Sequence, residues 1–194
     1  MEVGGIAHAH VRVLGRGVVL RLPRVSQLGL PPAENLAYQA ACFERAEPSD
    51  RTPRLIGLLP VAPELPGGVL VVEEIVGRPV ALPDDLAAIA EALARIHEMP
   101  LPPAQERAPL RNHRNPVAAT LETILFQARY LHDAGLRPEA IAAIAEELGW
   151  ARQFAGEIAA GTVKARQPVT LAATDTHPGN FLIRRDGRAI FVDL

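Results

Sequence analysis

The sequence has 194 residues, of which 48% are hydrophobic, and a formal net charge of −2 at pH 7. A chain of this length and hydrophobicity can bury a core as one compact domain or two small lobes, so an intrinsically disordered protein is not expected. The nearly neutral charge argues against a partner that is a nucleic acid or an anionic membrane surface, since both are normally bound by a basic excess.

The composition also restricts the chemistry. Cys42 is the single cysteine, which permits no internal disulfide and no cysteine-based zinc site. No apolar run approaches the roughly 18 residues of a membrane span, and the N-terminus lacks the features of a signal peptide, so a cytoplasmic protein is expected. Only Lys164 among the 20 Lys and Arg residues is a lysine. A mechanism that needs a lysine near the N-terminus is therefore excluded.

The first half of the chain alternates strands with one helix. Residues 11–22 form two Val- and Leu-rich runs around the turn Gly15–Gly17, which is typical of an antiparallel hairpin. Residues 33–46 place apolar side chains at helical spacing and predict a helix. Residues 69–75 are rich in β-branched side chains and predict a further strand, which ends in two acidic residues. The first lobe is expected to end there.

The second half predicts four helices and a closing hairpin. The helices are expected, in chain order, at residues 84–98, from Asn115 to Gly135, from Pro138 to Gly149 and from there to Gly161. The hairpin pairs residues 181–185 with residues 189–193. The strand-rich and helix-rich parts are thus segregated along the chain, which indicates an α+β protein.

The densest cluster of polar residues is the loop from Asp175 to Asn180, and Asp193 follows 13 residues after Asn180 at the end of an apolar strand. These side chains converge if the intervening hairpin folds back. Phosphoryl transfer requires a carboxylate that orients the attacking hydroxyl, and oxygen ligands that hold Mg²⁺ on the nucleotide phosphates. The loop provides both, although a purely structural loop closed by Asx turns has the same composition.

Residues 173–194 resemble the catalytic segment of the aminoglycoside phosphotransferase and choline kinase-like families, relatives of the protein kinases, whose pattern is His-Gly-Asp-x-His-x-x-Asn, strand, turn, strand, Asp. Further segments resemble other parts of these families in the same order. Residues 4–13 resemble the phosphate-covering loop, and residues 17–24 resemble the strand that follows it. Residues 35–45 resemble the helix with the ion-pair glutamate, and residues 68–80 resemble the strand that leads to the hinge between the lobes. Residues 86–100 resemble a helix with a histidine near its end.

The resemblance implies a protein kinase-like two-lobed α+β fold. Residues 1–77 would form a strand-rich N-lobe and residues 78–194 an incomplete helical C-lobe. It implies an ATP- (or GTP-) and Mg²⁺-dependent phosphotransferase whose partner is a small molecule with a hydroxyl group. Asp175 would be the catalytic base, and Asn180 and Asp193 would bind Mg²⁺.

The resemblance also implies a set of nucleotide-binding residues. The backbone of Gly4, Gly5 and Ile6 would lie over the phosphates. The side chains of Arg21 and Gln39 would stand where the family has an ion pair near the phosphates. The backbone of Glu73, Glu74 and Ile75 would face the adenine. The side chains of the two glutamates are expected to be a solvated strand end.

Several residues depart from the family pattern. Arg21 stands where the family has a lysine, so the positive charge is kept on a guanidinium group that is bulkier and forked. Gln39 stands where the family has a glutamate, so the partner of this charge is neutral. Ala173 replaces the histidine that precedes the catalytic aspartate. The sequence ends one residue after Asp193, where the family continues with helices that build the acceptor site, so a truncated kinase is expected.

These departures leave a second hypothesis open, namely a non-catalytic nucleotide-binding pseudokinase or an inactive fragment. His8 and His10 alternate along a strand and offer a further, weaker alternative as zinc ligands. The sequence identifies neither the acceptor nor the oligomeric state.

Overall fold

The computed structural model describes residues 2–4, 7–113, 115–161 and 170–194. The chain divides into two units, one formed by Met1–Leu110 together with Val169–Leu194 and the other by Arg111–Pro168. Among the described residues, no helix combines the length and the apolar character required to cross a membrane.

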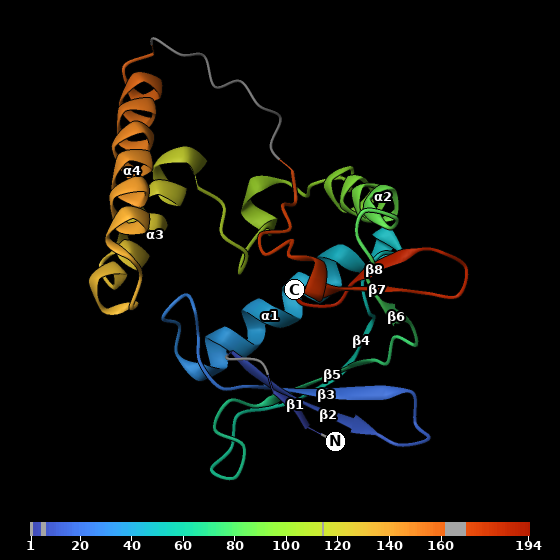
Figure 1. Ribbon diagram of the computed structural model, residues 1–194. Helices are drawn as coiled ribbons and strands as arrows, with labels where there is room; N and C mark the ends of the chain where they lie inside the picture. The colour runs from blue at the N-terminus through green and yellow to red at the C-terminus, as the bar shows by residue number, and fades with distance from the viewer. Residues whose placement is uncertain (1, 5–6, 114, 162–169) are drawn as a thin grey trace. The chain divides into compact units, whose positions relative to one another are not determined.

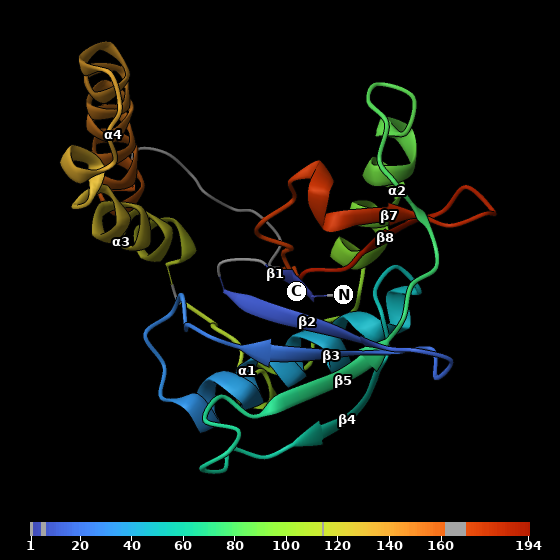
Figure 2. The ribbon, with the colours of Figure 1, turned by 60° about the horizontal axis from the view of Figure 1, so that its bottom comes forward.

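The first unit contains an antiparallel five-stranded sheet in the order β1-β2-β3-β5-β4 (Figure 2). Its strands are β1 (Glu2–Gly4), β2 (His8–Val13), β3 (Val18–Pro23), β4 (Leu55–Leu59) and β5 (Val69–Glu73). The predicted hairpin is confirmed as β2 and β3, and the turn between them uses positive φ angles at Gly15 and Gly17 (71° and 65°) that a glycine adopts without strain. The edge strand β4 was not predicted, because prolines flank it.

Helix α1 (Pro32–Ala46) lies along one face of this sheet, as Figures 1 and 2 show. It confirms the helix predicted for residues 33–46. Its apolar side packs on β5 in a core cluster, where burial of each large side chain contributes about 1.5–3 kcal/mol. The buried members of the cluster are Leu36, Ala40, Phe43, Leu70 and Val72.

A second, three-stranded sheet in the same unit has the order β6-β7-β8, with β6 (Arg78–Pro79), β7 (Phe181–Ile183) and β8 (Ala189–Phe191). The predicted closing hairpin is confirmed in a shorter form. Helix α2 (Leu86–His97) packs against it through a second core cluster. The 3₁₀ turns η1 (Glu47–Ser49), η2 (Ala104–Glu106) and η4 (Pro178–Asn180) complete the first unit.

The second unit consists of α3 (Pro116–Ala128), the 3₁₀ turn η3 (Leu131–Asp133) and α4 (Pro138–Ala159). The helix predicted from Asn115 to Gly135 is found in a shorter form as α3, and Asn115 caps it, because its side-chain oxygen accepts from the Ala118 amide at 3.1 Å. The prediction of two helices between Pro138 and Gly161 is wrong, since α4 is continuous. A glycine inside a helix costs only about 1 kcal/mol, and the apolar periodicity continues past Gly149.

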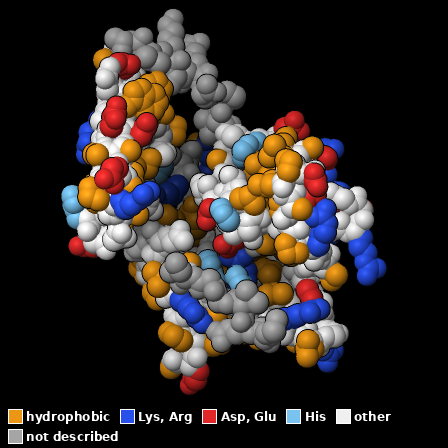
Figure 3. Space-filling model, in the orientation of Figure 1, with side chains coloured by type: hydrophobic (Ala, Val, Ile, Leu, Met, Phe, Trp, Pro, Cys, Tyr) orange, Lys and Arg blue, Asp and Glu red, His pale blue; other side chains and the backbone are white. Residues whose placement is uncertain are grey.

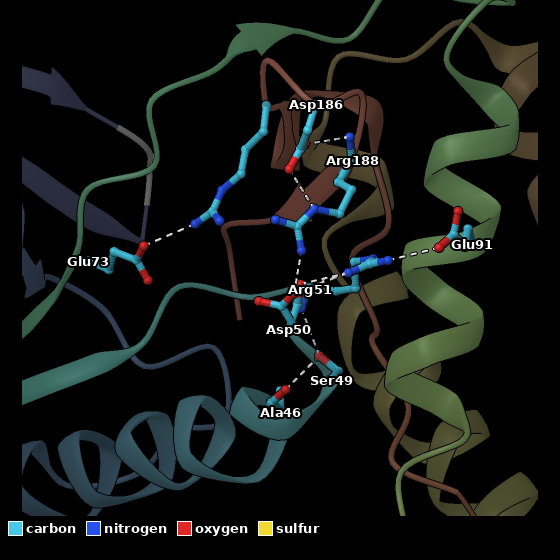
Figure 4. Close-up of polar contacts among 9 residues, drawn as sticks. Ala46, Ser49, Asp50, Arg51, Glu73, Glu91, Asp186 and Arg188 are labelled. Carbon is cyan, nitrogen blue, oxygen red and sulfur yellow. Dashed lines mark hydrogen bonds and ion pairs between the residues drawn. The ribbon is translucent and has the colours of Figure 1, made fainter.

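A network of arginine contacts ties α1, α2 and β8 together within the first unit (Figure 4). Arg51 donates to Glu91 on α2 at 2.8 Å, and its carbonyl oxygen accepts from the Phe191 amide of β8 at 2.8 Å. Arg188, beyond the β7–β8 turn, contacts Asp50 and Asp186. The chain end that carries Asp193 is thereby held beside the end of α1.

Asp85 joins β6 to the start of α2. Its carboxylate accepts two hydrogen bonds from Arg78, at 2.6 and 2.8 Å, and one from the Ala81 amide at 2.7 Å. The Arg78 contact, followed by the Ala81 amide, lowers the pKa of this carboxyl to about 2. Asp85 stands at the N-cap position of α2, but its side chain forms no capping hydrogen bond to this helix.

This lowered pKa predicts a loss of stability in acid. The contribution of Asp85 is fully present above the ordinary value of 3.8 and is lost as the pH falls toward about 2, because the unfolded chain takes up the proton first. In urea unfolding between about pH 5 and pH 2, Asp85→Asn should show a shallower pH dependence than the unmodified chain. The control Asp84→Asn, at an exposed position, should keep the steep dependence; equal profiles for both variants would contradict the prediction.

Hydrophobic, acidic and basic side chains are interspersed on the visible face of each unit (Figure 3). This distribution agrees with the nearly balanced net charge.

Candidate functional site

The loop from Asp175 to Asn180 is ordered by its own side chains. The Asn180 amide nitrogen Nδ2 donates to the carbonyl oxygen of Asp175 at 2.9 Å, and the His177 ring nitrogen Nδ1 accepts from the Gly179 amide at 3.0 Å. The Val192 amide donates to the carbonyl oxygen of Asn180 at 2.8 Å. The backbone next to Asp193 is therefore hydrogen-bonded directly to the loop that carries Asp175 and Asn180.

Arg21 points from β3 toward this chain end. Its Nη2 donates to Asp193 Oδ1 at 2.5 Å and its Nη1 donates to the carbonyl oxygen of Val192 at 2.6 Å. The guanidinium carbon lies 5.2 Å from the centre of the Phe43 ring, in cation–π geometry. Arg21 is only 2% exposed, so the ion pair is buried on the arginine side, whereas the Asp193 side chain is 38% exposed.

The resemblance implied that Gln39 would be the partner of Arg21, but the structure places it against His8. Its Oε1 lies 3.0 Å from Nε2 of His8 on β2, and the other nitrogen of this ring, Nδ1, lies 4.0 Å from Asp193 Oδ1. Burial, followed by the charge of Arg21, lowers the pKa of His8 below 6.5, although Asp193 and Gln39 act in the opposite direction. His8 thus bridges α1 and the chain end, a role that the sequence did not indicate.

The zinc hypothesis for His8 and His10 receives no support from the part of the chain that the structure describes. The two rings are stacked with their centroids 6.1 Å apart. Within this part, no group of three or more His, Cys, Asp and Glu side chains is arranged to hold a metal ion.

The two glutamates at the end of β5 are not a solvated strand end, so that prediction is wrong. Glu73 accepts from Arg184 at 3.0 Å, on the hairpin of the second sheet (Figure 4), and from Arg54 at 3.3 Å. Glu74 is paired with Arg12 on β2 and its side chain is 13% exposed. The backbone amides of Glu73 and Glu74 also have partners, since they donate to the carbonyl oxygens of Arg54 and Gly17 at 2.9 and 2.8 Å.

The three residues assigned to the phosphate-covering loop are only partly described. Gly4 ends β1, where it pairs with Ala9 of β2. Gly5 and Ile6 lie outside the described residues, so their assignment stays a prediction.

A cavity of about 210 Å³ lies between α1 and the segment that leads to Asp175. Asp175, Asp193, His8 and Gln39 contribute to its polar wall, and apolar side chains such as Phe191 close it. Cys42 also lines this cavity, and burial raises the pKa of its thiol to about 11, so that the thiolate is not available as a nucleophile near neutral pH.

Ala173 lacks the side chain with which the family's histidine anchors this segment. In its place, the backbone is held from α2, where Nε2 of His97 lies 3.4 Å from the Ala173 amide and the His97 carbonyl oxygen accepts from the Thr170 hydroxyl. His97 lies at the end of α2, and these contacts give it a structural role there.

The oxygens of Asn180 and Asp193 suit a hard divalent cation. The Asn180 amide group uses its nitrogen for Asp175, which leaves Oδ1 as an acceptor, and Arg21 engages only Oδ1 of the Asp193 carboxylate. The metal hypothesis therefore uses Oδ1 of Asn180 and the second carboxylate oxygen of Asp193, for which no partner is found among the described residues.

Comparison with known proteins gives two similarities. A model of the phosphotransferase enzyme family matches residues 4–194. The structure is similar to that of a choline/ethanolamine kinase family protein from Mesorhizobium loti, with a TM-score of 0.54 and 21% sequence identity, over 100% of this chain and 56% of that chain. No curated protein matches this sequence. The similarity of the structures confirms the predicted α+β fold of the choline kinase type, and this chain spans little more than half the length of that protein.

Proposed function

Since this chain belongs to the phosphotransferase enzyme family, we propose that it transfers a phosphoryl group from ATP, with Mg²⁺, to the hydroxyl group of a small molecule. The observation that best supports this proposal is that two hydrogen bonds join the segments that carry Asp175, Asn180 and Asp193: Asn180 donates to the Asp175 carbonyl oxygen, and the Val192 amide donates to the Asn180 carbonyl oxygen. The lobes proposed from the sequence, residues 1–77 and 78–194, would then enclose the nucleotide.

In this proposal Asp175 accepts the proton of the acceptor hydroxyl. The acceptor oxygen forms a bond to the γ-phosphorus while the bond from that phosphorus to the β–γ bridging oxygen breaks, and the nucleoside diphosphate leaves. Positioning and charge neutralisation dominate such a reaction. The hydrogen bond from Asn180 to the Asp175 carbonyl oxygen would fix the backbone of the base without occupying its carboxylate.

Asn180 and Asp193 would hold Mg²⁺, which when bound neutralises charge on the nucleotide phosphates. The backbone of Gly4, Gly5 and Ile6 would cover the phosphates and the backbone of the segment from Glu73 to Ile75 would face the base. The ion pair between Glu73 and Arg184 supports this arrangement, because it fixes the end of β5 against the second sheet.

The test is nucleotide binding by this chain with excess MgCl₂ and with EDTA, measured by calorimetry. The unmodified chain should bind ATP about tenfold or more tightly with Mg²⁺, since one contact to a charged group contributes about 1.5–3 kcal/mol. Asp193→Asn keeps an acceptor for Arg21 but removes the charge, and the ratio of the two affinities should fall toward one.

Asp186→Asn, on the exposed turn of the same hairpin, is the matched control and should retain the Mg²⁺ dependence. Two results would contradict the proposal: ATP binding by the unmodified chain that is absent or independent of Mg²⁺, or a ratio in Asp193→Asn that equals that of the control.

The pseudokinase is the second candidate, and it is favoured by the contacts of Arg21 and Gln39. Both side chains are engaged within the chain, Arg21 with Asp193 and Gln39 with His8. A pseudokinase would bind the nucleotide with no turnover that depends on Asp175.

A further inference from the structure

We propose that Arg21 and Asp193 form a closed ion pair that a divalent cation and a nucleotide open together by exchanging partners, so that neither ligand binds tightly alone. In the open state Arg21 pairs with a nucleotide phosphate and Asp193 pairs with the cation. This inference rests on the proposed function and deepens it, because it states how that site is regulated by its own residues.

The closed pair is held at two points. The guanidinium of Arg21 donates both to Asp193 Oδ1 at 2.5 Å and to the Val192 carbonyl oxygen at 2.6 Å, with the Phe43 ring below it. A lysine has one compact charge and cannot form this fixed fork. Arg21, where the family pattern has a lysine, therefore holds the Asp193 carboxylate, which is proposed to bind the metal, in a fixed ion pair.

Because Arg21 is buried, breaking its ion pair with Asp193 is unfavourable in free energy when only one of the two ligands binds. A cation that takes Asp193 alone leaves a guanidinium that is 2% exposed without its counter-ion, and it also places two cations side by side. A nucleotide that takes Arg21 alone leaves the carboxylate next to phosphate charge. Removing one partner of a buried ion pair is strongly unfavourable, since the remaining charge is not solvated.

Both ligands together avoid these costs, because every charge then has a partner of opposite sign. The guanidinium also has spare capacity for an anion: its Nε is buried with no hydrogen-bond partner in the described part of the chain. His8, 4.0 Å from Asp193 and bonded to Gln39, faces the same carboxylate and would stay in place when Arg21 leaves.

Two neutralising variants test the exchange from opposite sides, with direct binding as the readout. Arg21→Gln should bind Mn²⁺ alone, followed by electron paramagnetic resonance, about tenfold or more tightly than the unmodified chain, because a competing cation is gone. Asp193→Asn should bind ATP alone in EDTA about tenfold or more tightly, because Arg21 is then held by a neutral acceptor only and the carboxylate charge that repels the phosphates is gone. Arg185→Gln makes the same charge change as Arg21→Gln at an exposed position of the β7–β8 turn and should leave both affinities unchanged.

The proposal is overturned if Arg21→Gln binds Mn²⁺ no more tightly than the unmodified chain, or if Asp193→Asn gains no affinity for ATP alone. Asp193→Asn keeps a hydrogen-bond acceptor for Arg21, so it decides the matter if Arg21→Gln fails to fold. The Mn²⁺ measurement contains no nucleotide, and it therefore separates a failure of this inference from a failure of the proposed function, in which the unmodified chain would not bind ATP even with Mg²⁺.

Discussion

Asp175→Asn is expected to reduce phosphoryl transfer by about 10²–10⁴-fold, the range for loss of a positioned general base. An amide cannot accept the proton of the acceptor hydroxyl, whereas the fold of the loop should survive. Asn180 donates to the carbonyl oxygen of Asp175 and not to its carboxylate, so this hydrogen bond is unchanged in the variant. The affinity for ATP with Mg²⁺ should likewise change little.

The measurement is the release of ADP in the presence of a panel of amino-alcohols and sugars as acceptors, with ATP affinity determined in parallel. Asp186→Asn is the matched control on the hairpin and should keep full turnover. A variant at Asp175 that turns over at the rate of the unmodified chain would contradict the role of this residue. Nucleotide binding with no turnover in the unmodified chain would instead identify the pseudokinase.

The fold was predictable where local chemistry determines it. Glycines at the β2–β3 turn, the helical spacing in α1 and the Asn115 cap each gave an element that the structure contains. The break predicted at Gly149 failed because a glycine weakens a helix without ending it. Strand β4 was missed because its pairing with β5, a non-local contact, outweighs the flanking prolines.

The polar residues of the site were predictable as a set, but not their contacts. The family pattern placed Arg21 and Gln39 on β3 and α1, where they are found. Which side chain meets which depends on the packing of α1, β2 and β8, and this packing brings His8 rather than Arg21 to Gln39. One signal was available: His8 and His10 alternate along one strand, and Arg21 lies in the predicted hairpin that follows them.

The arginine content took on a different meaning in the structure. Composition alone gave no reason to assign any arginine a role, yet Arg21, Arg51 and Arg184 each join two separate elements. A guanidinium offers five donors in a fixed plane, so it can serve a carboxylate and a carbonyl oxygen at once. The near absence of lysine therefore coincides with a first unit that is cross-linked by forked contacts.

Phe43→Ala is expected to destabilise the first unit by about 3–5 kcal/mol, the usual cost of removing a buried phenyl ring. Phe43 is fully buried between α1 and the sheet, in contact with Leu70 and Val72, and its ring also lies under the guanidinium of Arg21. The substitution leaves a cavity in the core cluster and removes the aromatic face beneath a buried charge. The ion pair between Arg21 and Asp193 would then be weakened, because the guanidinium loses its contact with the ring.

The appropriate measurement is the urea dependence of amide hydrogen exchange in β5, because Trp150, the single tryptophan, lies on α4 in the other unit and would not report on this core. Phe43→Leu is the control. It keeps most of the apolar volume but no π face, and should cost about 1–1.5 kcal/mol. Equal losses for the two variants would show that the cavity is not the cause. A loss below about 1 kcal/mol in Phe43→Ala would contradict the packing of α1 on the sheet, and with it the placement of Arg21 beside Asp193.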